Sequence, residues 1–335
     1  MPTRILIALI SLVLAPVAFG ATRTESETFK IPAADAGIQL QVRNRHPAGT
    51  TRFAPDRVVL FVHGATFPVA SAFDVDLPGG SWMDYVAQQG FDVYGVDVRG
   101  YGGSTRPAAM DGDPKASAPF AVTRDAVRDV GAAVDFIFKR RGIAKLNVIG
   151  WSWGTTTMAT FAAENPEKVL RLVLFAPVWL PMRTVTYEGA YRTVTHDSTR
   201  VTAINGIPKD RVEEISPTAW YDKWWAATQA TDPGGASRNP PVLRAPNGVF
   251  KDFAEIWGAG KPVYDPAAIK ASTLVIVGEW DATTPPAMAQ ALFPQLTGAH
   301  NRRLVILSEG THQMSLETNR MRLIREVQHF LEEPL

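Results

Sequence analysis

Short runs of β-branched and aromatic residues recur along the chain, and stretches with apolar residues at helical spacing separate them. The runs that predict strands cover residues 38–42, 57–62, 91–96, 146–149, 169–175, 273–277 and 304–307. Helical spacing follows over about 123–141, up to Glu164, after Thr284, and from about Glu317 to Leu331. Because strands that alternate with helices pair in parallel through crossover connections, the pattern predicts an α/β fold with a mostly parallel central sheet flanked by helices.

The helix before the 146–149 strand has well-marked ends in the sequence. Thr123 is expected to be its N-cap, and apolar residues from Val127 to Phe138 recur on one face. Gly142 is expected to end the helix.

The alternation of strands and helices stops between about Val178 and Asp265. This stretch contains a group of tryptophans and the loop-forming sequence Asp232-Pro233-Gly234-Gly235, and the alternation resumes after it. The tryptophans are Trp179, Trp220, Trp224, Trp225 and Trp257. We therefore predict a core in two parts, residues 21–177 and 266–335, with residues 178–265 inserted as a cap or lid.

The N-terminal segment has the pattern of a secretory signal peptide. Arg4 precedes an apolar run from Ile5 to Phe19, and the small residues Ala18 and Gly20 stand before Ala21. The alternative is an uncleaved anchor, but this run contains Pro16 and is shorter than the roughly twenty residues that a spanning helix needs. We expect residues 1–20 to be removed, leaving an exported protein, periplasmic or secreted, without stable membrane insertion.

Composition narrows the function classes. The chain has 335 residues, 46% hydrophobic and 20% charged, as expected of a globular enzyme. Lys and Arg total 34 against 33 for Asp and Glu, and the absence of a dense basic run argues against a nucleic-acid partner. Cysteine is absent, which excludes disulfides, thiolate metal sites and a cysteine nucleophile. A chain of this size can form its core without a metal or cofactor, and none is expected; the oligomeric state stays open.

The pentapeptide Gly150-Trp151-Ser152-Trp153-Gly154 has the G-x-S-x-G form and lies between a predicted strand and a predicted helix. That context suits a nucleophilic serine on a sharp, strained turn, where flanking glycines leave room for the chain to pass closely. The N-terminus of the following helix favours negative charge that develops at the serine.

Two further residues strengthen this interpretation. Asp281 follows the 273–277 strand, and His312 follows the 304–307 strand. Because the loops after parallel strands gather at one edge of a sheet, Ser152, Asp281 and His312 are expected to meet there in the order serine, acid, histidine.

Taken together, these motifs resemble the α/β-hydrolase superfamily over nearly all of the chain after the leader. The resemblance rests on the strand followed by His63-Gly64, on DVRGYGGS at 97–104, on GWSWG, on VGEWDATTP at 277–285 and on GTHQMSLE at 310–317. It implies that Ser152 is the nucleophile, His312 the general base and Asp281 the residue that orients the histidine. It also implies an oxyanion hole formed by the backbone N–H groups of Trp153 and Ala65, with Thr66 as the alternative to Ala65. His63 is expected to pack against this loop.

The resemblance specifies the catalytic class more closely than the substrate. We predict a serine esterase that hydrolyses a small or medium carboxylic ester or lactone through an acyl-enzyme. The surroundings of Ser152 are similar to proline iminopeptidases, but those carry a glycine-rich HGGPG-type loop where this chain has His63-Gly64-Ala65-Thr66-Phe67. An amidase or aminopeptidase with the same triad, or a non-catalytic binding protein, are the alternatives. Tryptophans near the nucleophile or in the cap are candidates for the substrate pocket: Trp151, Trp220, Trp224 and Trp225.

Overall fold

The apolar runs form the strands of one eight-stranded sheet in the computed structural model, which describes residues 22–180 and 185–334. The expected signal peptide, residues 1–20, and its cleavage point before Ala21 lie outside these residues. The strands of the sheet are β1 (Thr24–Pro32), β2 (Gln39–Pro47), β3 (Val58–Val62), β4 (Asp92–Asp97), β5 (Leu146–Trp151), β6 (Val169–Phe175), β9 (Ser272–Gly278) and β10 (Arg302–Leu307).

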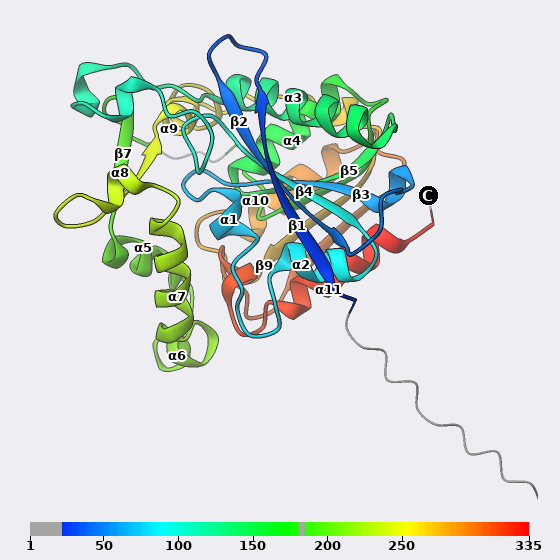
Figure 1. The fold of residues 1–335 in the computed structure, drawn as a ribbon. Coiled ribbons are helices and arrows are strands. Elements are labelled where there is room, and N and C mark those ends of the chain that lie inside the picture. The colour runs from blue at the N-terminus through cyan, green and yellow to red at the C-terminus, as the bar shows by residue number, and fades with distance from the viewer. Residues whose placement is uncertain (1–21, 181–184, 335) are drawn as a thin grey trace, which may run out of the picture.

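The strand order is β1-β2-β4-β3-β5-β6-β9-β10. Every pair from β4 to β10 is parallel, whereas β2 pairs antiparallel with both β1 and β4. The predicted fold class, a mostly parallel sheet flanked by helices, is confirmed (Figure 1).

The first two strands differ most from the expectation. β1 was not predicted, because most of its side chains are polar and face water at the edge of the sheet. β2 continues beyond the predicted end at residue 42 to Pro47, because polar side chains there have partners: Asn44 Nδ2 donates to Asp92 Oδ1 over 2.8 Å.

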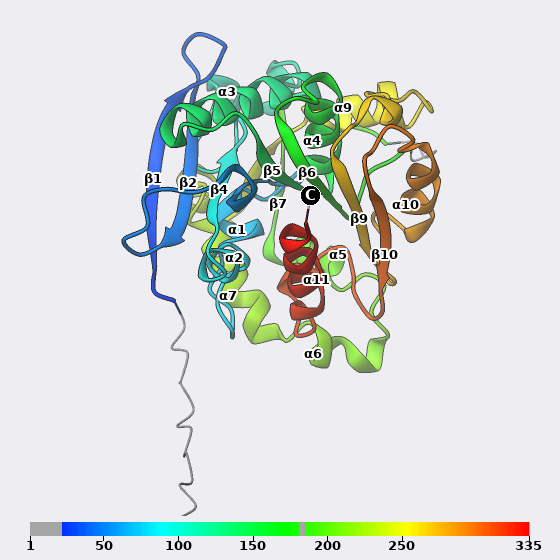
Figure 2. The same ribbon diagram turned by 90° about the vertical axis from the view of Figure 1, so that its right-hand side faces the viewer.

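Helices cover both faces of the sheet, and alternate residues of each strand belong to different cores. On β3, Phe61 packs in the core shared with α1 (Val69–Ala72), α2 (Trp82–Gln88) and α11 (Met321–Glu332). Leu60 and Val62 pack in the core shared with α3 (Thr123–Arg141), α4 (Trp153–Glu164) and α10 (Pro286–Leu292). Figure 2 shows α2 and α11 on one side of the strands and α3 and α4 on the other.

Two predicted helix starts are wrong. The residue at the N-cap of α3 is Val122, not Thr123, whose hydroxyl instead accepts a hydrogen bond from Trp153 Nε1. The last helix begins at Met321 rather than near Glu317, because Glu317 turns inward and accepts hydrogen bonds from Thr311. Throughout the described ranges, no helix is both long and apolar enough to cross a membrane.

The chain between β6 and β9 leaves the sheet and forms separate elements. They are β7 (Tyr191–Val194), α5 (His196–Ala203), α6 (Val212–Ile215), α7 (Thr218–Gln229), α8 (Pro233–Ala236), β8 (Leu243–Pro246) and α9 (Gly248–Asp252). β7 and β8 pair with each other as a second, two-stranded antiparallel sheet. Figure 1 shows β7 and helices α5 to α8 to the left of the main sheet. We call residues 178–265 the insertion segment.

Candidate active site

Ser152 lies on the sharp turn between β5 and α4. Its backbone has φ 55° and ψ −122°, a conformation that side-chain-bearing residues rarely adopt. The turn also explains the flanking glycines: a Cβ on Gly150 would come 2.3 Å from the carbonyl oxygen of Gly154, and one on Gly154 would come 2.3 Å from that of Val62. The strained turn therefore requires the G-x-S-x-G spacing.

A continuous chain of hydrogen bonds joins the three residues that the sequence placed at this edge. Ser152 Oγ is 2.9 Å from His312 Nε2, and His312 Nδ1 is 2.9 Å from Asp281 Oδ2. All three side chains are buried, with Ser152 and His312 each 8% exposed. Because a carboxylate can only accept, His312 Nδ1 carries the proton, so that Nε2 of a neutral ring accepts from the serine hydroxyl.

The turn after β9 holds Asp281 in place. Its Oδ1 accepts from the backbone N–H groups of Thr283 and Thr284, at 2.9 and 2.7 Å. Its Oδ2 accepts from the hydroxyl of Thr284 at 2.9 Å as well as from His312. The carboxylate is thus fully hydrogen-bonded and has one orientation toward the imidazole.

The loop after β3 runs beside the nucleophile, since a Cβ on Gly64 would lie 3.1 Å from Ser152 Cβ. Within residues 22–180 and 185–334, the backbone N–H groups of Ala65, Thr66 and Trp153 have no hydrogen-bond acceptor. Unpaired donors beside a nucleophile suit an oxyanion hole.

His63 holds this loop as expected. Val98 N–H donates to His63 Nε2, so Nδ1 carries the proton and donates to the carbonyl of Gly64 over 2.7 Å. Burial lowers the pKa of His63, which keeps its ring neutral and preserves this arrangement.

The four candidate pocket tryptophans occupy different surroundings. Trp151 lies beside the triad: its ring centroid is 5.5 Å from that of His312, and its Nε1 donates to the His312 carbonyl. Trp224 is fully buried, donates from Nε1 to the carbonyl of Ser71, and has its ring centroid 4.8 Å from that of Phe67.

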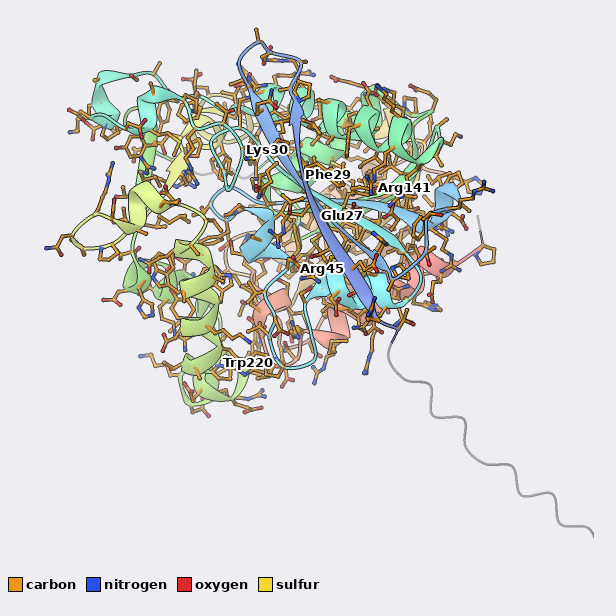
Figure 3. The ribbon with its side chains drawn as sticks, viewed as in Figure 1. Glu27, Phe29, Lys30, Arg45, Arg141 and Trp220 are labelled. Atoms are coloured by element: carbon orange, nitrogen blue, oxygen red, sulfur yellow. The ribbon has the colours of Figure 1, made fainter. Side chains whose placement is uncertain are left out.

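The other two, like Trp224, lie on α7. Trp225 packs edge-on against His196, at 6.0 Å between ring centroids. Trp220, on the first turn of α7 (Figure 3), lines a small cavity together with Trp224, Gln313 and Glu317.

Sequence reasoning missed several residues that support this site. Thr284 stands in the quoted VGEWDATTP motif, so its place beside Asp281 could have been inferred. Nothing in the sequence pointed to Arg192 of β7, whose guanidinium donates to the carbonyl of Ala65. No cluster of three or more His, Asp or Glu side chains in the described part of the chain is arranged to bind a metal ion.

Comparisons with known proteins agree with this architecture. Residues 57–317 match the sequence model of the alpha/beta hydrolase fold family. Lipase member M of Mus musculus is 30% identical over 165 residues, which are 48% of this chain and 38% of the lipase. The chain therefore matches less than half the length of that relative.

Solved structures resemble this chain over most of its length. An esterase from Thermogutta terrifontis has a TM-score of 0.58 at 18% identity, over 91% of this chain and 98% of the esterase. A meta-cleavage product hydrolase from Pseudomonas fluorescens has a TM-score of 0.61 at 16% identity, over 90% and 96% of the two chains. At these identities the likeness concerns the fold alone.

Proposed function

Because the chain belongs to the alpha/beta hydrolase family, we propose that it is a serine hydrolase that cleaves a small or medium carboxylic ester or lactone through an acyl-enzyme at Ser152. The observation that carries the proposal is the unbroken hydrogen-bond chain from Ser152 through His312 to Asp281, next to unpaired backbone N–H groups.

In the proposed reaction, Ser152 Oγ attacks the acyl carbon while its proton passes to His312 Nε2. Asp281 stabilises the imidazolium that forms, and the N–H groups of Trp153 and Ala65 bind the developing oxyanion. His312 then gives the proton to the departing alkoxide. Water attacks the acyl-enzyme, loses its proton to His312, and the carboxylic acid leaves as Ser152 regains its hydrogen.

An ester or lactone is favoured over an amide by two considerations. The relatives include a lipase at 30% identity. The loop after β3 has Ala65-Thr66-Phe67 where proline iminopeptidases carry glycines and a proline. An amidase or aminopeptidase with the same triad is the alternative function.

The insertion segment is proposed to cap the site. Trp224 Nε1 bonds the carbonyl of Ser71 in α1, which follows the loop that begins at Gly64, so the segment rests directly on the surroundings of the nucleophile. Trp151, Trp220 and Trp225 are proposed to shape the acyl side of the substrate pocket, while Trp224 serves as the docking contact.

The signal-peptide pattern at 1–20 extends the proposal to export, with the mature chain beginning near Ala21 and a small-molecule ester as its partner. N-terminal sequencing of the exported protein tests this. Recovery of intact Met1 on membrane-bound protein would favour an anchor instead.

The experiment that tests the catalytic proposal compares wild type with Ser152→Ala. We expect a fluorophosphonate probe to label wild type and a p-nitrophenyl ester to be hydrolysed, with both signals lost in Ser152→Ala. Ser237→Ala, at the C-cap of α8, is the matched control and should keep both.

A panel that adds a lactone and an aminoacyl p-nitroanilide separates the rivals. Preference for the anilide would replace the esterase proposal with an aminopeptidase. Labelling that persists in Ser152→Ala would reject the nucleophile, and no labelling or turnover in wild type would favour a non-catalytic member of the family.

A further inference from the structure

Arg192 of β7 reaches from the insertion segment to the loop beside the nucleophile. Its Nη2 donates to the carbonyl of Ala65 at 2.6 Å and to Thr66 Oγ1 at 2.8 Å. Its Nη1 donates to the carbonyl of Pro246 in the neighbouring strand β8 at 2.6 Å. The ring of Phe250 lies 4.3 Å below the guanidinium.

This guanidinium has no acidic partner. Among the described residues, no carboxylate lies within ion-pairing distance of Arg192, and burial lowers its pKa. A cation removed from water is costly unless hydrogen bonds satisfy it, and here carbonyl oxygens take that role. The guanidinium is therefore satisfied by the carbonyl oxygens of Ala65 and Pro246 and by the hydroxyl of Thr66.

Binding a carbonyl fixes the N–H group across the same peptide bond. A trans peptide is planar, with its C=O and N–H pointing in opposite directions. The Gly64 carbonyl is held by His63, which orients the N–H of Ala65. The Ala65 carbonyl is held by Arg192 and by the hydroxyl of Tyr101 at 2.7 Å, which orients the N–H of Thr66.

We propose that the N–H of Thr66 acts beside that of Ala65 in the oxyanion hole, and that Arg192 is its positioning residue, through which the insertion segment holds the Ala65–Thr66 peptide in its catalytic orientation. The inference rests on the proposed hydrolase function. The insertion segment then contributes to the rate of the chemical step and not only to substrate choice, because the hydrogen bonds from Arg192 to Ala65 and Thr66 exist only while the segment is docked.

The geometry favours positioning over direct substrate binding. The two terminal nitrogens of Arg192 are already engaged with Pro246, Ala65 and Thr66. A substrate carboxylate would have to displace these bonds, and contact of that kind would affect KM for anionic substrates rather than kcat.

The test compares Arg192→Met and Arg192→Lys with wild type on the ester that wild type cleaves best. We expect kcat to fall about 10- to 100-fold in Arg192→Met, below the full loss of an oxyanion donor, while KM changes little. A boronic acid, which forms a tetrahedral adduct with the serine and places an oxygen in the hole, should bind more weakly by a similar factor. Millimolar guanidinium should restore part of kcat in Arg192→Met, and Arg192→Lys should retain an intermediate rate.

Arg238→Met is the matched control. Arg238 donates to Tyr191 Oη of β7 at 2.9 Å and has no hydrogen bond to the loop at 64–66. The Arg238→Met substitution should lower neither kcat nor boronate affinity. The melting temperatures of Arg192→Met and Arg238→Met report whether either substitution unfolds the segment.

A second variant keeps the test open if the Arg192 variants fold poorly. Tyr101→Phe removes only the hydroxyl that donates to the same Ala65 carbonyl, and a smaller loss of kcat with weaker boronate binding is expected. If Arg192→Met folds, unchanged kcat and unchanged boronate affinity in that variant would overturn the inference. If it does not fold, the same result in Tyr101→Phe would overturn it. So would an equal loss in Arg238→Met, or a loss confined to KM and largest for succinyl esters. Failure of wild type to cleave any ester, or full activity in Ser152→Ala, would instead refute the proposed function.

Discussion

The edge of the sheet around Ser152 and the insertion segment satisfy their buried polar groups in different ways. At the sheet edge the partners that fix the acid are local: Asp281 accepts from Thr283 and Thr284, two and three positions along the chain. The longer-range bonds there, from Ser152 to His312 and from His312 to Asp281, join loops that the parallel strands already bring to one edge. In the insertion segment they are remote: Arg192 bonds Ala65 across 127 positions, and Trp224 bonds Ser71 across 153.

The difference indicates where each region is vulnerable. A site built from short turns keeps its geometry as long as its own strands form. Contacts between the insertion segment and the loop after β3 exist only when the two parts dock, so local opening of the segment would remove them together. We expect substitutions at the sheet edge to change the rate without changing stability, and substitutions at the docking contacts to change both.

The largest expected effect is at the sheet edge. Asp281→Asn should leave the fold intact but lower kcat on the order of 10⁴-fold, because an amide N–H facing His312 selects the wrong tautomer, as in serine proteases. Steady-state kinetics and a melting curve test this. Glu279→Gln, an exposed carboxylate on the same loop, is the control and should keep the wild-type rate. A near-wild-type rate in Asp281→Asn would place the acid elsewhere, first in the loop after Phe175.

The next effect is at a docking contact. Trp224→Ala removes a fully buried ring and the bond from its Nε1 to Ser71, so we expect a loss of about 3–5 kcal/mol in the free energy of unfolding. Activity should fall on all esters alike. Trp220→Ala, at a half-buried position on the same helix, should cost less stability. A native melting temperature with loss only on long acyl chains would instead make Trp224 a specificity residue.

A third effect depends on pH. Burial raises the pKa of Glu317 to about 7, above its usual range. The folded state therefore holds the proton more tightly than the unfolded chain, and the resulting stabilisation is complete below pH 4.5 and is lost as the pH rises through 7. The neutral side chain of Glu317→Gln avoids this loss.

The melting temperature of Glu317→Gln relative to wild type should therefore rise between pH 5 and pH 8, by a few degrees if each pKa unit corresponds to about 1.4 kcal/mol. Glu309→Gln is the control. Hydrogen bonds from Arg211 and Arg322 hold the pKa of Glu309 below its usual range, so it stays ionised and its difference from wild type should be constant. A flat difference for Glu317→Gln would show that its carboxyl titrates normally.

The smallest effect is a refinement of the sheet edge. Thr284→Val removes the hydroxyl that donates to Asp281 Oδ2 while keeping the side-chain shape, so we expect a loss of about 1 kcal/mol in transition-state stabilisation, up to tenfold in kcat. Thr283→Val keeps the backbone N–H that bonds Asp281 and should have no effect on the rate. A loss in both variants would mean that the shape of the turn, rather than the hydroxyl, supports the acid.

The sequence by itself determined the fold class and the common location of Ser152, Asp281 and His312. Both follow from short-range signals: apolar runs define parallel strands, and parallel strands deliver the residues after them to one edge. The glycines around Ser152 were equally informative, because the close approach that they permit is a property of a single turn.

Tertiary structure alone decided the features that depend on remote partners. β1 became a strand because it pairs with β2 at the sheet edge, and the last helix started late because Glu317 turned toward Thr311. The contact between Arg192 and Ala65 could not be inferred, because the position of an arginine in the sequence does not indicate which distant carbonyl it will meet. Local chemistry leaves a pattern at fixed spacing along the chain, whereas a contact between distant segments exists only once both have folded and docked.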